Sequence, residues 1–149
     1  MIVAPIGGGG LISGVSVAAK SLNPKVKLIG IEPSGASRYS KSLNANKPIK
    51  LDETDTIADG TRTDQADQNN FEIIRKYVDE IKSVDDEEIK DAIRLMVKKG
   101  KMVIEPSSAM VIAAFMNKNN GTTIDDKVCF VLSGGNNDIE FLANILIGK

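Results

Sequence analysis

Four consecutive glycines, Gly7–Gly10, stand between an apolar run and a segment rich in small apolar residues. Ile2–Ile6 predicts a short buried strand and Leu11–Leu22 a helix, so the glycines form a strand-to-helix corner. Because glycine has no side chain, an anion can closely approach the backbone N–H groups of such a corner. The helix that follows adds unpaired N–H groups and the positive end of its dipole. The pattern predicts a phosphate-binding loop; the simpler alternative is a flexible turn.

Strands and helices alternate along the rest of the chain, which favours an α/β fold. Lys27–Ile31 and Val128–Leu132 predict two more buried strands, and Glu80–Val84 predicts a shorter one. This order predicts a mainly parallel, twisted sheet with helices on both faces, formed by residues 1–149 as a single domain. The other expected helices are Ser37–Ala45, Phe71–Val78, one that starts after Asp85, one from Ser107 to Asn117, and Asp138–Leu146.

Two helix starts carry specific signals. Asp85 and Glu88 have the spacing of a capping box, in which each side chain accepts a hydrogen bond from a backbone N–H at the helix start. The acidic run Asp85–Glu88 is therefore interpreted as favourable charge at a helix start rather than as paired catalytic carboxylates. Ser107 is expected to cap the next helix, which extends to Asn117.

Composition excludes several classes of function. A net charge of -1 and an aromatic content of 4% predict no nucleic-acid or membrane partner. The absence of histidine excludes serine–histidine and cysteine–histidine nucleophile pairs and disfavours zinc sites. The single cysteine, Cys129, lies in an apolar run, so we expect a buried thiol and a cytoplasmic location. Neither a signal peptide nor a membrane-spanning run is expected.

A second motif, Ser133–Asn136, follows the last predicted buried strand and contains two glycines. The carboxyl ends of parallel strands lie at one edge of a sheet, where ligands of open α/β sheets collect. The Ser133 hydroxyl can donate to or accept from a ring nitrogen of a ligand, while the glycines leave room for the ring. A simple strand-to-helix turn is the alternative, but the two motifs together are more specific than either alone.

A dinucleotide is the competing ligand for the glycine corner. Gly8, Gly10 and Ser13 nearly follow the dinucleotide fingerprint, and Glu32 stands at the end of the next predicted strand, where a ribose-binding acid belongs. However, Ser13 replaces the third glycine of the fingerprint, and nothing downstream resembles a hydride-transfer site. A nicotinamide-dinucleotide-binding domain is therefore the second hypothesis.

Four segments occur in order and carry a family resemblance: Ala4–Leu11, Thr56–Gly60, Ile104–Pro106 and Leu132–Asn136. Together they resemble the threonine dehydratase, serine dehydratase and serine racemase group of fold-type II pyridoxal-phosphate (PLP) enzymes. The likeness runs from the first strand to the last helix. Cysteine synthases of the same fold usually have threonine in the phosphate loop, so the all-glycine loop favours the dehydratase–racemase branch.

The resemblance implies a role for each matching residue and names PLP as the cofactor. It places Gly60 and Glu105 along the cofactor ring, and Ser133 opposite the pyridine nitrogen. A serine does not keep that nitrogen protonated as a carboxylate would, which suits elimination of a hydroxyl group. The resemblance implies β-elimination of water from serine or threonine, giving ammonia and a 2-oxo acid. The residues implied to hold the PLP phosphate are Gly7, Gly8, Gly9, Gly10 and the amide of Leu11.

The chain departs from the family pattern in its lysines. The family's Schiff-base lysine lies in a Ser-x-Lys-x-Arg-Gly-type motif, and this sequence contains no such segment. Its 15 lysines stand in polar or charged settings, so no catalytic residue is assigned. We therefore expect the C-terminal part of a dehydratase large domain, inactive alone, with the substrate-binding small domain before Met1. The end of the chain soon after the last helix favours the catabolic or racemase-like type over the regulated biosynthetic type.

A second departure concerns metal. In some racemase-like members, a glutamate, a backbone carbonyl and an aspartate bind a divalent cation. Glu32 and the Ala36 carbonyl match this set, but Arg38 stands where the aspartate is expected, so no metal site is predicted. The acidic residues of the loop between 52 and 59 are interpreted as solvated; they are Asp52, Glu53, Asp55 and Asp59.

Three functions remain open on the sequence alone. The first is part of a PLP-dependent serine/threonine ammonia-lyase, with a serine racemase fragment as a variant of the same site. The second is the dinucleotide-binding domain. The third is a non-catalytic chain that binds PLP or phosphate or acts as an assembly partner. An amino acid is the expected substrate of the whole enzyme, and association with a second copy or with the missing N-terminal half is the expected assembly.

Overall fold

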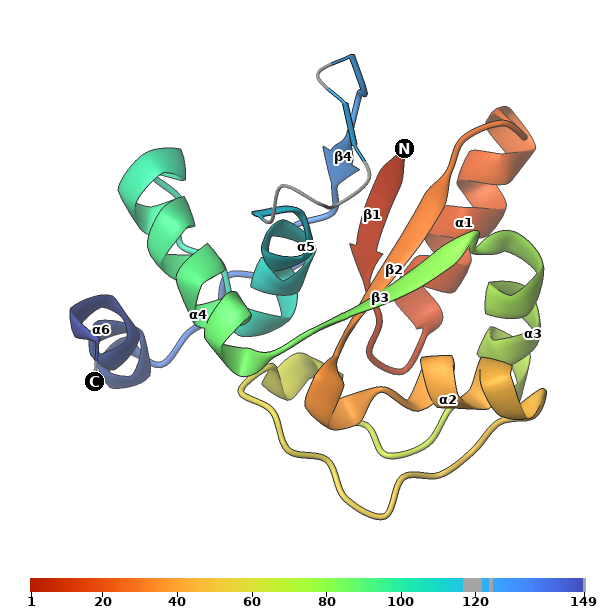
Figure 1. The fold of residues 1–149 in the computed structure, drawn as a ribbon, viewed down its shortest axis with the longest axis horizontal. Coiled ribbons are helices and arrows are strands. Elements are labelled where there is room, and N and C mark those ends of the chain that lie inside the picture. The colour runs from red at the N-terminus through yellow and green to blue at the C-terminus, as the bar shows by residue number, and fades with distance from the viewer. Residues whose placement is uncertain (117–121, 124, 149) are drawn as a thin grey trace.

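Four parallel strands form one sheet in the order β3-β2-β1-β4 (Figure 1). In the computed structural model, which describes residues 1–116, 122–123 and 125–148, β1 pairs with both β2 and β4, with Ile2 opposite Leu28 and Cys129. The predicted α/β fold with a parallel sheet is thereby confirmed. The strands are β1 Ile2–Pro5, β2 Leu28–Pro33, β3 Glu80–Val84 and β4 Cys129–Phe130.

Helices cover both faces of the sheet, as expected. Figure 1 shows α1 and α3 on one side of the strands and α4 and α5 on the other. Among the described residues, no helix is long and apolar enough to span a membrane. The helices are α1 Gly10–Leu22, α2 Arg38–Ala45, α3 Gln68–Tyr77, α4 Asp86–Leu95, α5 Pro106–Met116 and α6 Ile139–Ile147, with short 3₁₀ helices at Ser34–Ala36 and Asp59–Thr61 and a π-helical turn at Met96–Gly100.

Alternation along β1 divides the core into two clusters. Val3 faces α4 and α5, where it packs in a cluster that includes Ile93 and Met110. Ala4 faces the opposite way, into a cluster that includes Ile12 of α1 and Phe71 of α3. Because successive side chains of a strand point to opposite faces, both clusters are built on the same short strand. The glycine corner that follows β1 is therefore anchored from both sides of the sheet.

The last strand differs from its prediction. Val128–Leu132 was expected to be a buried strand, but β4 contains only two residues, and Cys129 is exposed rather than a buried core thiol. The physical reason is position: β4 lies at the edge of the sheet and pairs with β1 alone among the described strands. An edge strand has one unpaired side, so its apolar sequence is only half covered. Phe130 retains a core contact through its edge-to-face packing on Phe115.

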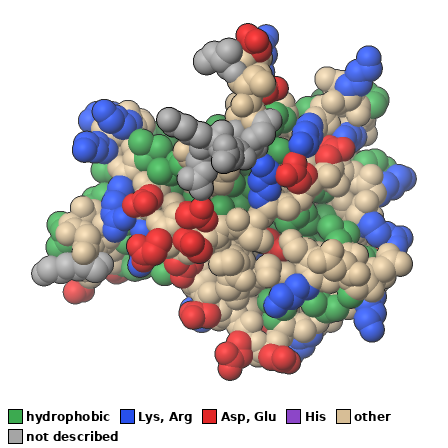
Figure 2. Space-filling model, in the orientation of Figure 1, with side chains coloured by type: hydrophobic (Ala, Val, Ile, Leu, Met, Phe, Trp, Pro, Cys, Tyr) green, Lys and Arg blue, Asp and Glu red, His purple; other side chains and the backbone are tan. Residues whose placement is uncertain are grey.

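The predicted start of α4 is confirmed. The Asp85 side chain accepts from the Glu88 N–H at 2.8 Å, and the Glu88 side chain accepts from the Asp85 N–H at 2.9 Å. The interpretation of this acidic run as helix-start charge is thus confirmed, and Figure 2 shows acidic side chains gathered where α4 begins. Ser107 is a correction: α5 begins at Pro106, so Ser107 lies inside its first turn and is not its cap. Proline suits the first helical position because the N–H that it lacks would be unpaired there.

Asp85→Ala should lower the free energy of unfolding by about 0.5–2 kcal/mol, because one helix-start N–H loses its acceptor and Glu88 loses its reciprocal partner. Urea unfolding followed by circular dichroism measures the difference. Asp85→Asn, which keeps a side-chain acceptor, is the matched control and should retain most of the stability. Equal losses in the two variants would contradict the assignment of the cap.

Candidate functional site

The glycine corner presents unpaired amides. In the part of the chain that the structure describes, the N–H groups of Gly7, Gly8 and Gly9 donate to no protein acceptor. Gly9 has φ 90° and ψ -13°, in the left-handed region, and directly precedes α1. Successive N–H groups around a left-handed residue form a concavity that binds anions, and the helix start adds positive potential. The local geometry therefore fits the phosphate-binding loop that the sequence predicted.

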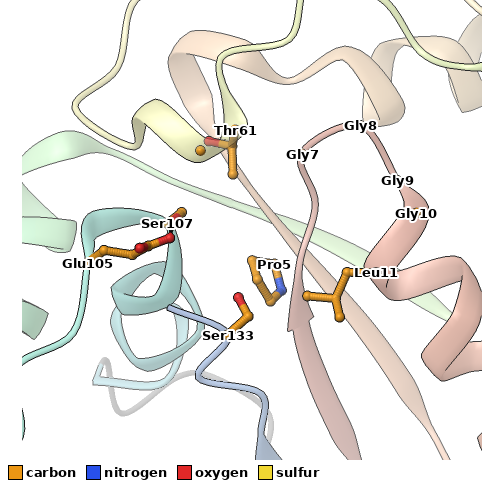
Figure 3. A pocket seen from close by; sticks show the side chains of 11 residues that line it. Pro5, Gly7, Gly8, Gly9, Gly10, Leu11, Thr61, Glu105, Ser107 and Ser133 are labelled. Atoms are coloured by element: carbon orange, nitrogen blue, oxygen red, sulfur yellow. Dashed lines mark hydrogen bonds between the residues drawn. The ribbon is translucent and has the colours of Figure 1, made fainter. Parts of the chain in front are cut away.

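The two sequence motifs meet in one cavity. The glycine corner, at the end of β1, and Ser133, just beyond β4, line the same space of about 180 Å³. In Figure 3, Glu105 and Ser107 lie on one side of this cavity and the glycines on the other, with Ser133 between them. All eight residues predicted to bind the cofactor line it: Gly7, Gly8, Gly9, Gly10, Leu11, Gly60, Glu105 and Ser133. Their adjacency is a finding, and their contact with a cofactor stays a prediction.

Gly60 reaches the cavity through a tether to α4. The Asp86 carboxylate accepts from the Thr56 hydroxyl at 2.7 Å and from the Ile57 N–H at 3.0 Å. This fixes the segment that turns through Asp59–Thr61 and brings the Gly60 carbonyl beside the glycine corner. A Cβ atom at Gly7 would lie 2.9 Å from that carbonyl oxygen, so glycine at position 7 permits the close approach of the two backbones.

Glu105 is held in place by the segment after β4. Its backbone N–H donates to the Gly134 carbonyl at 3.2 Å, and its carboxylate accepts from Ser107 Oγ and from the Asn136 N–H. A Cβ atom at Gly134 would overlap this carboxylate, which explains a glycine there. The Gly134 N–H also donates to Ser108 Oγ at 2.8 Å. These bonds connect the start of α5 to the second motif and fix one wall of the cavity.

Three lining residues were not identified from the sequence: Pro5, Thr61 and Ser107. Pro5 lies within the Ala4–Leu11 segment and Thr61 directly follows Gly60, so adjacency alone could have suggested them. Ser107 was assigned to a cap, and its hydrogen bond to the Glu105 carboxylate places it in the cavity wall instead. In the described chain, none of the lining residues is a lysine.

Glu32 does not have the position that a ribose-binding acid needs. It has an exposure of 0%, and its carboxylate accepts from the Tyr39 N–H at 3.1 Å and the Ser40 N–H at 2.9 Å. Burial raises the pKa of the Glu32 carboxyl, opposed by these hydrogen bonds and by the nearby Arg38 guanidinium. A carboxylate already satisfied in the interior cannot bind a ribose hydroxyl, and the feature that favoured a dinucleotide is therefore lost.

The Arg38 guanidinium lies beside Glu32 and the Ala36 carbonyl. Its Nη1 donates to that carbonyl at 2.8 Å, and its side chain has an exposure of 0%. Burial lowers the pKa of the guanidinium, while the Glu32 charge raises it. The loop acids Asp52 and Glu53, like the other two acids of that segment, have exposed side chains, as expected for a solvated loop.

Comparison with known proteins decides the family. The sequence matches the family model described as "Pyridoxal-phosphate dependent enzyme" over residues 1–134. The chain belongs to this family. It is 40% identical over 146 residues to an L-threonine ammonia-lyase of Thermotoga maritima, and the match covers 98% of this chain and 36% of that protein.

Serine racemases are also similar to this family member. Over 142 residues it is 42% identical to the serine racemase of Arabidopsis thaliana, covering 93% of this chain and 43% of that protein. The crystal structure of maize serine racemase superposes with a TM-score of 0.88 at 36% identity, covering 99% of this chain and 46% of that one. The chain thus spans less than half the length of these relatives.

The cavity of this PLP-family chain fits the family's cofactor. The unpaired N–H groups after β1 suit a phosphate dianion, and the glycine positions leave no side chain over them. Ser133 supplies a hydroxyl on a different wall, and Glu105 supplies a carboxylate beside Gly60. PLP as the predicted cofactor is confirmed for the family, whereas the roles of the individual residues remain predictions.

Gly9→Ala should destabilise the corner. A left-handed conformation costs a residue with a Cβ atom about 1–2 kcal/mol, and this Cβ would also overlap the Tyr39 ring and lie 2.9 Å from Asn70 Cβ. Gly8→Ala is the matched control, because its Cβ atom meets nothing within 4 Å. Thermal unfolding should show a clear loss for Gly9→Ala and almost none for Gly8→Ala; equal transition temperatures would contradict the conformation assigned to Gly9.

Proposed function

We propose that this chain supplies the phosphate-binding and ring-binding part of the active site of a PLP-dependent ammonia-lyase that acts on serine or threonine. The observation that carries the proposal is the single cavity in which three unpaired N–H groups of the glycine corner lie across from Ser133 and Glu105. The reaction is elimination of water from a hydroxy amino acid, which yields a 2-oxo acid and ammonia. The similarity to L-threonine ammonia-lyase supports this reaction class.

A serine racemase is the second candidate, supported by the 42% identity to the Arabidopsis enzyme. Both reactions would use the same cavity, because both start with a PLP-bound amino acid. When bound, the cofactor supplies the electron sink that either reaction needs, and the protein supplies position and electrostatics. The residues of this chain that line the cavity do not separate the two candidates.

Each wall of the cavity has a proposed role. The amides of Gly7–Gly10 and Leu11 bind the phosphate dianion, to which hydrogen bonds are charge-assisted and therefore strong. The Ser133 hydroxyl bonds the ring nitrogen without forcing it to carry a proton. Glu105, oriented by Ser107 Oγ, lines the ring together with Gly60. The sequence pattern indicated the roles of the glycine corner and Ser133, whereas those of Gly60 and Glu105 were implied only by the family resemblance; the shared cavity supports all four.

The Schiff-base lysine is proposed to come from a polypeptide segment outside this sequence, since no lysine lines the described cavity. The chain alone is then proposed to bind the cofactor noncovalently and to be inactive. Its apolar surface supports an association with that segment or with a second copy. Met102 and Val103 have exposures of 45% and 54%, and they border a hollow beside the end of β4.

The chain should bind pyridoxamine phosphate, which has an amine instead of the aldehyde and so forms no imine with surface lysines. Binding should be at least about 30-fold tighter than that of pyridoxamine, because each hydrogen bond to a charged phosphate contributes about 1.5–3 kcal/mol. Titration followed by amide NMR shifts measures both affinities and should move the signals of Gly7–Leu11.

The alternative outcomes of this titration are distinct. Tight binding of NADH without binding of pyridoxamine phosphate would favour the dinucleotide hypothesis instead. With PLP itself, an absorption spectrum of the free aldehyde is expected. A stoichiometric imine band would show that a lysine of this chain does form the Schiff base, and would contradict the proposal that the lysine lies outside it.

Ser133→Asp should raise the pKa of the ring nitrogen of bound pyridoxamine phosphate by at least about one pH unit, because a carboxylate stabilises the protonated ring. The 15N chemical shift of that nitrogen, followed across pH, measures the change. Ser133→Ala is the control for loss of the hydroxyl and should not raise the pKa. If both variants titrate like the unmodified chain, Ser133 does not face the ring nitrogen.

A further inference from the structure

We infer that Arg38 and Tyr39 are positioning residues for the phosphate-binding loop: they bind its carbonyls from the interior and so turn its N–H groups toward the cavity. The inference rests on the proposed function, because it concerns how the loop would hold a phosphate. Neither side chain is among the described lining residues of the cavity, so neither would touch the phosphate itself.

Arg38 binds the first two carbonyls of the loop. Its Nη2 donates to the Ile6 carbonyl at 3.3 Å and also to the Gly7 carbonyl. The planar guanidinium can bind several carbonyls at once because its N–H groups are fixed in a fork. A fully buried arginine is rare in a protein interior, since its charge must be paired and its donors satisfied. Here Nη1 and Nη2 bind backbone carbonyls, of which that of Ile6 is buried and that of Gly7 partly buried, while the buried Nε has no partner among the described residues.

Tyr39 and Asn70 bind the third carbonyl. The Tyr39 hydroxyl donates to the Gly8 carbonyl at 2.8 Å, and the Asn70 side chain, from α3, donates to the same oxygen at 3.0 Å. The fourth carbonyl, that of Gly9, accepts from the Ser13 N–H at 3.0 Å as the first bond of the helix. We call Arg38, Tyr39 and Asn70 the carbonyl clamp.

Peptide planarity converts this clamp into an orientation of the amides. In a trans peptide, the C=O of one residue and the N–H of the next point in opposite directions. Holding the carbonyls of Ile6, Gly7 and Gly8 on the interior side therefore directs the N–H groups of Gly7, Gly8 and Gly9 the other way. These are the N–H groups that donate to no protein acceptor in the described chain. The clamp thus fixes three successive amide donors without touching their ligand.

The clamp is itself fixed by the start of α2. Glu32 accepts from the N–H groups of Tyr39 and Ser40, and Arg38 Nη1 donates to the Ala36 carbonyl. These bonds hold the first turn of α2 against the end of β2, so the two side chains that α2 contributes to the carbonyl clamp, Arg38 and Tyr39, have little freedom. The ring of Tyr39 also occupies the space that a side chain at Gly9 would need.

Charge gives Arg38 a second effect. A guanidinium stays protonated at any physiological pH, so its positive charge lies behind the loop permanently. The charge acts across a poorly solvated interior, where electrostatic interactions are stronger than in water. Glu32 offsets part of this charge, and Tyr39, whose pKa is raised by burial, stays neutral. The loop would therefore bind a phosphate dianion on its cavity side, while the partly offset positive charge of Arg38 lies on its opposite side.

The test compares Tyr39→Phe, and Tyr39→Phe combined with Asn70→Ala, with the unmodified chain. Tyr39→Phe should bind pyridoxamine phosphate about fivefold to tenfold more weakly, and the double variant about 30-fold or more, because the Gly8 carbonyl loses its donors. Affinity for pyridoxamine, which lacks the phosphate, should change less than about twofold. Backbone order parameters of Gly7–Gly9 in the free protein should fall from about 0.85 toward 0.6 in the double variant.

Tyr77→Phe is the matched control, since Tyr77 is the other tyrosine of the chain and its ring contacts Lys76 on its own helix. It should leave both affinities unchanged. Arg38→Lys keeps the charge but loses the fork, and should also weaken only the phosphate-bearing ligand. Should Arg38→Lys not fold, the tyrosine variants decide the matter.

Unchanged order parameters and phosphate selectivity in the double variant would overturn the inference, as would equal losses for the two ligands. The failure of the proposed function has a different signature: the unmodified chain would not discriminate pyridoxamine phosphate from pyridoxamine. The order parameters, measured without any ligand, would still test the clamp in that case.

Discussion

The site depends on the opposed directions of N–H and C=O in every trans peptide. A loop that offers amides to an anion must turn its carbonyls the other way, and in this chain they turn toward side chains of α2 and α3. The Ile6 carbonyl is buried and the next two along the loop are partly shielded, and a buried polar group without a partner costs free energy comparable to a lost hydrogen bond. Arg38, Tyr39 and Asn70 are the donors to these three carbonyls. The same three peptide groups therefore point their N–H groups toward the anion site and their carbonyls toward Arg38, Tyr39 and Asn70.

The parallel sheet brings the remaining walls to this loop. Since β1 and β4 are adjacent and parallel, the residues that follow them emerge at the same edge. Glu105 and Gly134 are then in close contact. The Glu105 N–H donates to the Gly134 carbonyl, and the Glu105 carboxylate lies where a Cβ atom at Gly134 would stand. Gly60 arrives through the tether of Thr56 to Asp86. Four segments that are distant in sequence thus form one cavity: two meet because β1 and β4 end together, and the other two are brought in by these contacts.

Much of the fold was predictable because its signals are local. The bounds of β3 were predicted to the residue, and those of β2 and of most helices to within a few residues, by apolar periodicity and by caps such as Asp85 and Glu88. Only the start of α4 was predicted, and the predicted end of α5, Asn117, lies outside the described residues. The failures occurred where the environment outweighed the pattern. The apolar run around Cys129 has the composition of a buried strand, but it lies at an edge of the sheet. Ser107 has the composition of a cap, but Pro106 already begins the helix.

The sequence by itself determined the glycine corner, the order of strands and helices, and the serine after the last strand, because each is set by residues adjacent in the chain. Gly60 and Glu105 followed only from the family resemblance, since no local pattern links them to the corner. The tertiary structure alone decided that Arg38 and Tyr39 lie behind the loop and that Glu32 is buried against α2. Those contacts depend on how β2 places α2 beside the glycine corner. Because the two segments are far apart in the sequence, no pattern of neighbouring residues can predict that they meet.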